Sequence, residues 1–353
     1  MATSVGRPEQ KNKPDVAGLR PALRTWFARE RRDLPWRATT DPYAIWVSEI
    51  MLQQTRVATV IERYGEFLRR FPSIQALAAA DEAEVLALWS GLGYYRRARM
   101  LHQAARHLYV EQRGVVPGSF AALLELPGVG RYTAAAIASI AFHEPVAAVD
   151  GNVERVILRL MGWGSEDPTT EREHLRRVAQ MADRLLDPSA PGDWNQAMME
   201  LGATVCLPRG PRCAQCPWLA ACATRGQHEA AKRPAMRTVE MARVWVTRRG
   251  GDELLLVQRS PAETVMPGMW ELPEMQPVAA QPGQPLLRLR HAIMQVNYRV
   301  AIHAAGRVPS LPKGSVSRWV TAEEAVGLPL TGLTRKAMRA MGWLATARVP
   351  LSQ

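Results

Sequence analysis

The sequence is poor in cysteine and has no long apolar run. Only 4 of its 353 residues are cysteine, and they share one window of 17 residues, so a small disulfide-rich secreted scaffold is not expected. A membrane-spanning helix needs about 20 apolar residues, and the chain contains no such stretch. It shows no secretory signal pattern either. We therefore expect a protein of a reducing compartment with no membrane association.

Acidic residues are scarce relative to basic ones. The chain carries 45 Lys and Arg against 33 Asp and Glu, a formal net charge of +12, and its isoelectric point is about 10.1. Such an excess serves either solubility or a polyanionic partner, because Lys and Arg that neutralise phosphates release counterions. The hydrophobic content of 47% is ordinary for folded domains, and the length allows two of them.

The composition changes along the chain and divides it into regions. We predict a disordered tail over residues 1–18, a mostly α domain over 19–225, a polar linker over 226–240 and an α+β domain over 241–346. A turn over 249–252 favours a hairpin between the first two strands of the last region. Helical patterns cover residues 44–71, 81–89, 98–112, 133–142, 153–161, 173–186, 194–206 and 334–344, and strand patterns cover 242–246, 254–258, 298–302 and 317–320.

The cysteines follow the spacing Cys-x6-Cys-x2-Cys-x5-Cys on a basic, turn-rich loop over 206–222. Four thiolates this close together can surround one metal centre, either a [4Fe–4S] cluster or a structural zinc ion. Zinc sites commonly use two short cysteine pairs, and only one short pair is present here. The spacing therefore favours iron–sulfur and leaves zinc as the alternative. The expected ligands are Cys206, Cys213, Cys216 and Cys222.

A Gly-x-Gly turn joins two helical patterns at Gly128, Val129 and Gly130, and Arg131 follows it. Such a turn exposes backbone N–H groups at the start of the second helix, where an anionic phosphate binds favourably. An ordinary helical hairpin has the same pattern. With the preceding Leu-Pro and the following Arg, the segment resembles the helix-hairpin-helix element of DNA repair proteins, which implies that these residues contact DNA phosphates.

Asp150 lies just ahead of a predicted helix. On this pattern alone it is a helix N-cap, a position that Asp favours. The order of hairpin, carboxylate and four-cysteine loop, however, resembles the endonuclease III superfamily of base-excision DNA glycosylases. That resemblance implies an essential role for Asp150. Lyase-competent members carry a Lys where this chain has Tyr132, and because Tyr cannot form an imine, we expect no efficient lyase activity.

Glu49 is a charged residue in an otherwise apolar helical run. Periodicity alone favours an exposed face for it, whereas burial would raise the pKa of its carboxyl group and keep it protonated near neutral pH. Several motifs resemble the adenine DNA glycosylase (MutY) family over roughly residues 20–225. They are Leu34-Pro35-Trp36-Arg37, the run from Trp46 to Thr55, Asp150-Gly151-Asn152-Val153, Trp194-Asn195-Gln196 and the cysteine loop.

The resemblance implies a division of roles among these residues. A glycosidic bond breaks with an acid on the leaving base and an anion beside the sugar, and a base in a duplex must first be flipped into a pocket. Glu49 is then the acid that protonates adenine, and Asp150 stabilises the sugar cation. The resemblance further implies that Tyr132, Asn152 and Arg37 assist them, that Trp36 and Gln196 border the adenine, and that Gln54 and Tyr94 enter the base stack.

The last region resembles the Nudix-like C-terminal domain of the same family, on the segments 254–259 and 267–273. The glutamate-rich metal box of true Nudix hydrolases is missing from it. In the family this domain recognises 8-oxoguanine through a short Phe-Ser-His segment, and here Ile293, Met294 and Gln295 stand in its place. Gln295 is the residue able to hydrogen-bond a base edge, and this departure bears on how strongly 8-oxoguanine is distinguished from guanine.

The sequence thus predicts a monofunctional adenine DNA glycosylase. Its expected partner is double-stranded DNA with adenine opposite 8-oxoguanine or guanine, and we expect a monomer in the cytoplasm, associated with a nucleoid of the bacterial type. One alternative is a glycosylase for thymine opposite guanine on the same scaffold. The other is a non-catalytic DNA-binding clamp. The setting of Glu49 argues against the thymine alternative, and the presence of both Glu49 and Asp150 argues against the clamp.

Overall fold

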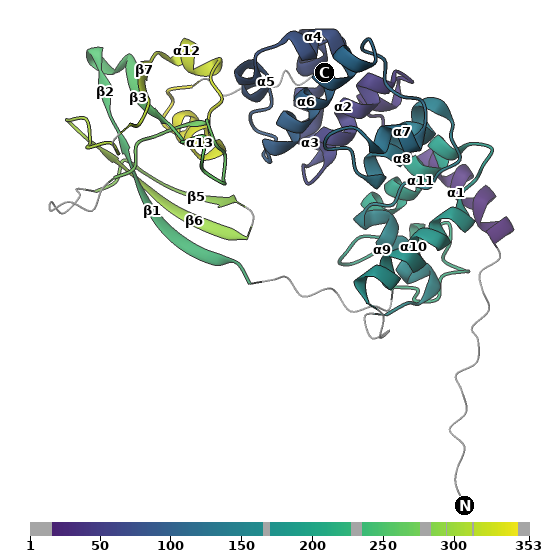
Figure 1. Cartoon of the computed structure of the whole chain (residues 1–353). Helices are drawn as coiled ribbons and strands as arrows, with labels where there is room; N and C mark the ends of the chain where they lie inside the picture. Colours follow the sequence, from purple (N-terminus) through teal and green to yellow (C-terminus); the bar gives the residue numbers. More distant parts are fainter. Residues whose placement is uncertain are drawn as a thin grey trace, which may run out of the picture. The chain divides into compact units, whose positions relative to one another are not determined.

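The computed structural model describes residues 16–164, 170–226, 235–275, 284–293, 295–312 and 314–344. The chain forms two compact units, one from residues 1–49 and 115–232 and the other from 50–114 and 233–353. Most of the predicted tail and part of the predicted linker lie outside the described residues, and the first helix begins at Val16. Figure 1 shows the order of the elements along the chain.

The first unit is helical and is built around one large apolar core. Leu23, Ile157, Leu185 and Leu201 are fully buried in this core, and they come from four different helices. Helical spacing of apolar residues accounts for these faces. The elements are α1 (Val16–Glu30), η1 (Pro35–Arg37), α2 (Pro42–Leu52), α7 (Phe120–Leu124), α8 (Arg131–Phe142), α9 (Gly151–Met161), α10 (Glu171–Leu185), α11 (Pro191–Thr204) and η2 (Cys213–Gln215).

Two glycines allow α11 to lie close against its neighbours. A Cβ atom at Gly192 would stand 2.8 Å from the Cα of Ile140 on α8, and a Cβ at Gly202 would stand 2.6 Å from the Cβ of Asn152 on α9. Only glycine permits such an approach of two helix backbones. The helix α11 is therefore fixed against the two helices that carry the hairpin turn and Asp150.

In the second unit, four helices lie between α2 and the hairpin in sequence. They are α3 (Val57–Arg70), α4 (Ile74–Ala79), α5 (Glu82–Leu88) and α6 (Arg96–Glu111). The single helical pattern expected over 44–71 is broken between Leu52 and Val57, where Gln54 has a φ of 53°. A left-handed residue ends an α-helix, so this expectation was wrong at that point.

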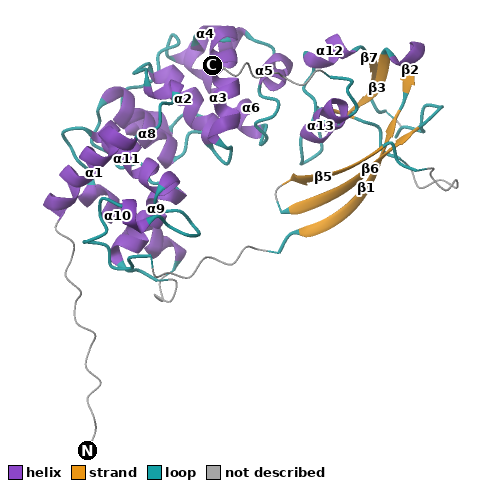
Figure 2. Cartoon of the chain, turned by 180° about the vertical axis from the view of Figure 1, so that it is seen from behind, coloured by secondary structure: helices purple, strands orange, loops and turns teal. Residues whose placement is uncertain are grey.

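The remainder of the second unit combines two sheets with two helices, and Figure 2 shows the strands grouped in this region. A three-stranded sheet has the order β1-β6-β5, with β1 and β6 parallel and β5 antiparallel to β6. In the other sheet β3 pairs with β2, β4 and β7. The elements are β1 (Arg237–Trp245), β2 (Thr247–Arg248), η3 (Arg249–Gly251), β3 (Glu253–Gln258), β4 (Trp270–Glu271), β5 (Leu287–Ile293), β6 (Val296–Ala304), β7 (Ser317–Val320), α12 (Ala322–Val326) and α13 (Gly332–Ala340).

The helical region followed by a mixed α and β region is as predicted, but the expected hairpin is wrong in one respect. The turn over 249–252 joins β3 to the two-residue strand β2, not to the long first strand. That first strand begins at Arg237 instead of 242, because it pairs in parallel with β6 along its whole length. The sequence carries no local signal for such a distant parallel partner.

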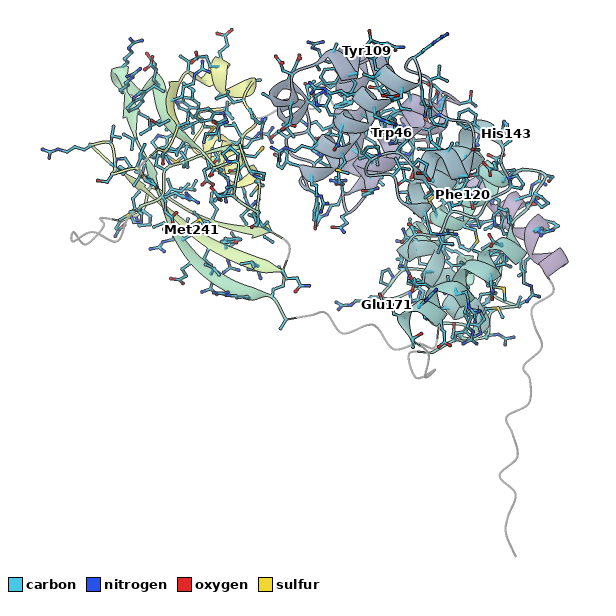
Figure 3. All side chains as sticks on the ribbon, in the orientation of Figure 1. Trp46, Tyr109, Phe120, His143, Glu171 and Met241 are labelled. Carbon is cyan, nitrogen blue, oxygen red and sulfur yellow. The ribbon has the colours of Figure 1, made fainter. Side chains whose placement is uncertain are left out.

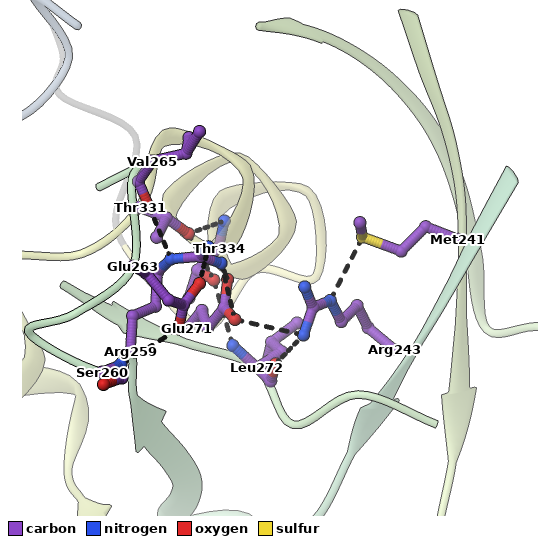
Figure 4. Close-up of polar contacts among 10 residues, drawn as sticks. All are labelled: Met241, Arg243, Arg259, Ser260, Glu263, Val265, Glu271, Leu272, Thr331 and Thr334. Carbon is purple, nitrogen blue, oxygen red and sulfur yellow. Dashed lines mark hydrogen bonds and ion pairs between the residues drawn. The ribbon is translucent and has the colours of Figure 1, made fainter. Parts of the chain in front are cut away.

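Glu271 on β4 is an ion-pairing centre in this region (Figure 4). Arg259 donates to both of its oxygens at 3.0 and 2.9 Å, and Arg243 lies 3.3 Å from one of them. Beside it, the backbone N–H of Leu272 donates to the hydroxyl of Thr334 at the start of α13. These contacts tie the 267–273 segment to the sheet and to the last helix.

Candidate active site

Glu49 lies on α2 and is buried, with only 5% of its surface exposed. The hydroxyl of Tyr132, from the first turn of α8, donates to Glu49 Oε2 at 2.6 Å and also lies 3.0 Å from the sulfur of Met199. Burial raises the pKa of Glu49 to about 7, and the charge of Asp150 adds to this, although the Tyr132 hydrogen bond and Arg37 oppose it. Glu49 is therefore a carboxyl group that exchanges its proton near neutral pH.

Asp150 caps α9 and is itself held by that helix. Its Oδ1 accepts hydrogen bonds from the backbone N–H groups of Asn152 and Val153, and its Oδ2 accepts one from the Asn152 side chain at 2.8 Å. The sequence pattern predicts a helix N-cap at Asp150, and the structure confirms it. The cap also fixes the carboxylate in a helix-terminal position, where the macrodipole favours negative charge.

Arg37 lies in the short helix η1 and is held by a second buried glutamate. Its Nη2 atom donates to Glu200 Oε2 at 2.9 Å, and Arg32 binds the same carboxylate through two hydrogen bonds of 2.7 Å. Burial alone would raise the pKa of Glu200, but the hydrogen bonds from Arg32 and Arg37 outweigh it and lower the pKa to about 2. Glu200 is thus a permanent anion.

The segment that leads to Asp150 is fixed by Asn195 of α11. Its side-chain oxygen accepts from the backbone of Ala148, and its Nδ2 donates to Ser139 and to the carbonyl oxygen of Val146, all within 3.0 Å. The next residue, Gln196, is half-buried on the same helix. Trp36, the other residue predicted beside the adenine, is buried with 7% exposure.

The predicted phosphate-binding turn has an open helix start. Gly128 has a φ of 76°, which a side chain would strain. Gly130 is the N-cap of α8 and no side chain caps the N–H groups that follow it. Val129 is buried, whereas Arg131 is exposed. The guanidinium of Arg131 lies 5.4 Å from the ring centroid of Phe120. Figure 3 labels Phe120. This geometry suits an anion.

The four cysteines carry free thiols and line one cavity together with Arg159, Pro211 and Leu219. Burial raises the pKa of Cys216 to about 11, so without a cation this thiol stays protonated. Within the described part of the chain, no three His, Cys, Asp or Glu side chains converge closely enough for a single metal ion. Four cysteine sulfurs around one cavity are the donors that either an iron–sulfur cluster or a zinc ion uses.

Two arginines of α9 connect this loop to the helix that Asp150 caps. Arg155 donates to the carbonyl oxygens of Cys206 and Gly202 and, at 2.8 Å, to the side-chain oxygen of Asn152. Arg159 donates to the sulfur of Cys206 at 3.2 Å and to the carbonyl oxygens of two following residues. The chain of contacts from the cysteine loop thus ends one hydrogen bond from the Asp150 carboxylate.

The other predicted site residues belong to the second unit. Gln54 and Tyr94 are exposed, and both have left-handed backbones with φ of 53° and 48°. Gln295 is exposed at the turn between β5 and β6, and Ile293 ends β5. Met294, also part of that prediction, lies outside the described residues.

Sequence reasoning missed four residues that hold the site together: Glu200, Arg32, Asn195 and Arg155. Asn195 belongs to the Trp194-Asn195-Gln196 motif, but the motif alone does not indicate its contacts. Glu200 is one turn beyond that motif on α11, and a glutamate at a helix position facing the core was the available signal.

The chain is similar in sequence and fold to known proteins. Residues 47–181 match the HhH-GPD superfamily, described as base excision DNA repair proteins. The adenine DNA glycosylase of Mus musculus is 35% identical in an alignment that covers 92% of this chain and 78% of the mouse protein. The chain belongs to the adenine DNA glycosylase family. The family member from Homo sapiens is 46% identical over 224 residues, 61% of this chain and 41% of the human protein.

A solved structure of a thermostable thymine-DNA glycosylase is also similar, with a TM-score of 0.54 and 31% identity over 59% of this chain and 97% of that one. The matched family segment includes Glu49, Tyr132 and Asp150 and stops before the cysteine loop. No described helix has the length and apolar character to cross a membrane.

Proposed function

We propose that this protein is a monofunctional adenine DNA glycosylase of base excision repair, which removes adenine mispaired with 8-oxoguanine or guanine. Membership of the adenine DNA glycosylase family supports the activity. The observation that carries the chemistry is the buried Glu49 carboxyl group with a pKa of about 7, hydrogen-bonded to Tyr132 and close enough to Asp150 to sense its charge.

Glu49 is the acid of the proposed reaction. In its protonated form it gives its proton to the adenine ring as the bond to the sugar breaks, so that the base leaves as a neutral molecule. Its pKa near 7 keeps a useful fraction protonated at neutral pH.

Asp150 supplies the negative charge beside the sugar. As the glycosidic bond lengthens, positive charge develops on the sugar ring, and a fixed carboxylate stabilises it without reorganising. Asn152 and the N-terminus of α9 hold that carboxylate in place. Tyr132 has a hydroxyl and no amine, so attack on the sugar to form an imine is not available to it.

The hairpin turn, with Gly128, Gly130 and Arg131, is proposed to bind a DNA phosphate through backbone N–H groups. Gln54 and Tyr94 are proposed to enter the base stack, where an aromatic ring and an amide suit bases. The region after 241 is proposed to be a Nudix-like lesion reader in which Gln295 contacts the purine opposite adenine. Trp36 and Gln196 are proposed to border the adenine.

Cys206, Cys213, Cys216 and Cys222 are proposed to hold a [4Fe–4S] cluster, with zinc as the alternative. The position of all four residues around one cavity supports this proposal. When bound, it would cross-link the loop and give it a fixed shape. The arginines of α9 then hold that loop to the helix that Asp150 caps. Visible absorbance of the purified protein distinguishes iron–sulfur from zinc.

The thymine alternative retains one observation in its favour, the 31% identity to a thymine-DNA glycosylase structure. A single-turnover assay separates the candidates. It uses duplexes with adenine opposite 8-oxoguanine, adenine opposite guanine and thymine opposite guanine. We expect adenine release, fastest opposite 8-oxoguanine, and loss of that release in Glu49→Gln and Asp150→Asn. Exposed Glu62 provides the control Glu62→Gln, which should match wild type.

Thymine release without adenine release would favour the alternative, and tight binding with no release would favour a clamp. Equal rates opposite 8-oxoguanine and guanine would keep the enzyme and remove the lesion-reading role of Gln295. Borohydride should trap no covalent complex with DNA, and trapping would contradict the monofunctional assignment.

A further inference from the structure

One arginine in the second unit binds two loops at once. Arg97 lies in the first turn of α6, and its guanidinium reaches the last turn of α2, the loop that follows α2 and the loop that precedes α6. Nη1 and Nη2 donate to the carbonyl oxygens of Ile50, Met51, Gln53, Leu92 and Gly93 and to the hydroxyl of Thr55.

The two loops are also joined without the arginine. The Thr55 hydroxyl donates to the carbonyl oxygen of Leu92 at 3.0 Å, and the indole N–H of Trp89 donates to the carbonyl oxygen of Gly93. Arg97 lies over the rings of both Trp89 and Tyr94, at 5.6 and 5.4 Å from their centroids. It is therefore enclosed by carbonyl dipoles and aromatic faces.

Each loop has a residue whose backbone is left-handed although it is not glycine. Gln54 has a φ of 53° and Tyr94 a φ of 48°, and both are exposed, Tyr94 by 46%. Such conformations persist where the surrounding contacts determine them, and they concentrate at functional sites. An exposed aromatic ring and an exposed amide are side chains that stack on bases and hydrogen-bond to their edges.

We infer that Arg97 is a positioning residue that ties these two loops together and holds Gln54 and Tyr94 as a rigid pair of base-contacting tips. The inference rests on the proposed function for the contact with DNA bases. The planar guanidinium is needed because it presents donors to both loops at the same time. A lysine keeps the positive charge but has one ammonium group and cannot serve both loops, so Arg97→Lys should release the tips.

The test is a double-mutant cycle. Arg97→Lys is made in the wild-type chain and in a Gln54→Ala/Tyr94→Ala chain, with exposed Arg96→Lys as the matched control. The probe is a duplex with a tetrahydrofuran abasic analogue opposite guanine and 2-aminopurine next to it, which reports insertion into the stack without any base release. Affinity, 2-aminopurine fluorescence and thermal midpoint are measured for each chain.

In the wild-type chain, Arg97→Lys should weaken binding about tenfold and reduce the fluorescence change. In the Gln54→Ala/Tyr94→Ala chain, Arg97→Lys should reduce the binding affinity little more than Arg96→Lys does. An equal loss in both chains would overturn the inference, because Arg97 would then act only on the fold. If Arg97→Lys fails to fold, Thr55→Val, which removes one bridge between the loops, is taken through the same cycle and judged by the same criterion.

The two proposals fail separately. A wild-type chain that inserts into the probe but releases no adenine from a mispair would contradict the proposed function. The mutant cycle would still test the role of Arg97, because it measures insertion and not base release. A chain that releases adenine and shows additive losses would keep the function and remove Arg97 from the positioning role.

Discussion

The hydroxyl of Tyr95 lies 3.1 Å from the carbonyl oxygen of Leu330, 235 positions further along the chain. The Ser90 hydroxyl approaches the same oxygen at 3.5 Å, and Arg99 donates to the carbonyl oxygen of Pro267 at 2.7 Å. Helices between α2 and the hairpin are in this way bound to the sheet-containing region within one compact unit.

Tyr95→Phe should therefore lower the free energy of unfolding of the sheet-containing region. The substitution removes one buried donor, and a lost hydrogen bond of this kind costs about 1 kcal/mol. Urea unfolding and limited proteolysis after residue 241 would measure it. Tyr109→Phe is the control, because Tyr109 is 53% exposed. Equal stability of the two variants would contradict a role for this contact.

Adenine release should depend on the protonation of Glu49. Its pKa of about 7 means that the acid form is present below this pH and is lost above it, so the single-turnover rate should fall about tenfold per pH unit above 7. The Tyr132 hydrogen bond lowers this pKa. In Tyr132→Phe the decline should therefore move to higher pH, and a decline that stayed in place would argue that another group is the acid.

The same burial should cost stability. Burial keeps Glu49 protonated up to a pH of about 7, whereas in the unfolded chain it ionises near its ordinary pKa of 4.5. Its contribution to stability is therefore intact below pH 4.5 and falls until about pH 7. The cost above that pH is roughly 3 kcal/mol. Glu49→Gln should thus be more stable than wild type at pH 8 and similar to it at pH 4, as urea unfolding at the two pH values would show.

Two substitutions of Asp150 should distinguish its role in catalysis from its role as a helix cap. Asn also caps helices well, so Asp150→Asn should retain stability and lose adenine release, whereas Asp150→Ala should lose both, with about 1 kcal/mol from the cap. Thermal melts and single-turnover rates of the two variants decide this. Full activity in Asp150→Asn would show that charge at this position is not required.

Gly202→Ala should displace Asn152 and with it the Asp150 carboxylate that Asn152 holds. The new methyl group would press on Asn152 at 2.6 Å, and overpacking of this kind costs about 1–3 kcal/mol. Gly151→Ala is the matched control, since a Cβ there meets nothing within 4 Å and Ala favours a helix. We expect slower adenine release and a lower melting temperature in Gly202→Ala alone.

Local patterns in the sequence were sufficient for much of this structure. The helices around Asp150 and the hairpin follow from apolar spacing and turn residues. The exposed position that periodicity favoured for Glu49 was wrong, because α2 is apolar around its whole circumference and lies inside the unit. Periodicity cannot distinguish faces on such a helix.

Contacts between residues that are far apart in the chain could not be predicted from the sequence. Arg32 and Glu200 are 168 positions apart, and nothing local to either residue indicates the pair. The parallel partner of β1 is also distant in sequence, and the acceptors of Arg97 come from the end of α2 and from two irregular loops. Tertiary packing decides such contacts, and a single sequence does not record which remote residues will meet.

Glu200 has a consequence for the neighbouring acid. It binds Arg37, the cation whose charge acts on Glu49 and favours its ionised form. A carboxylate that stays ionised down to a pKa of about 2 neutralises that arginine at every physiological pH. Burial keeps the proton on Glu49, and Glu200 limits the opposing effect of Arg37 by pairing with it. The pH range in which this enzyme works is set partly by a residue that takes no part in the reaction.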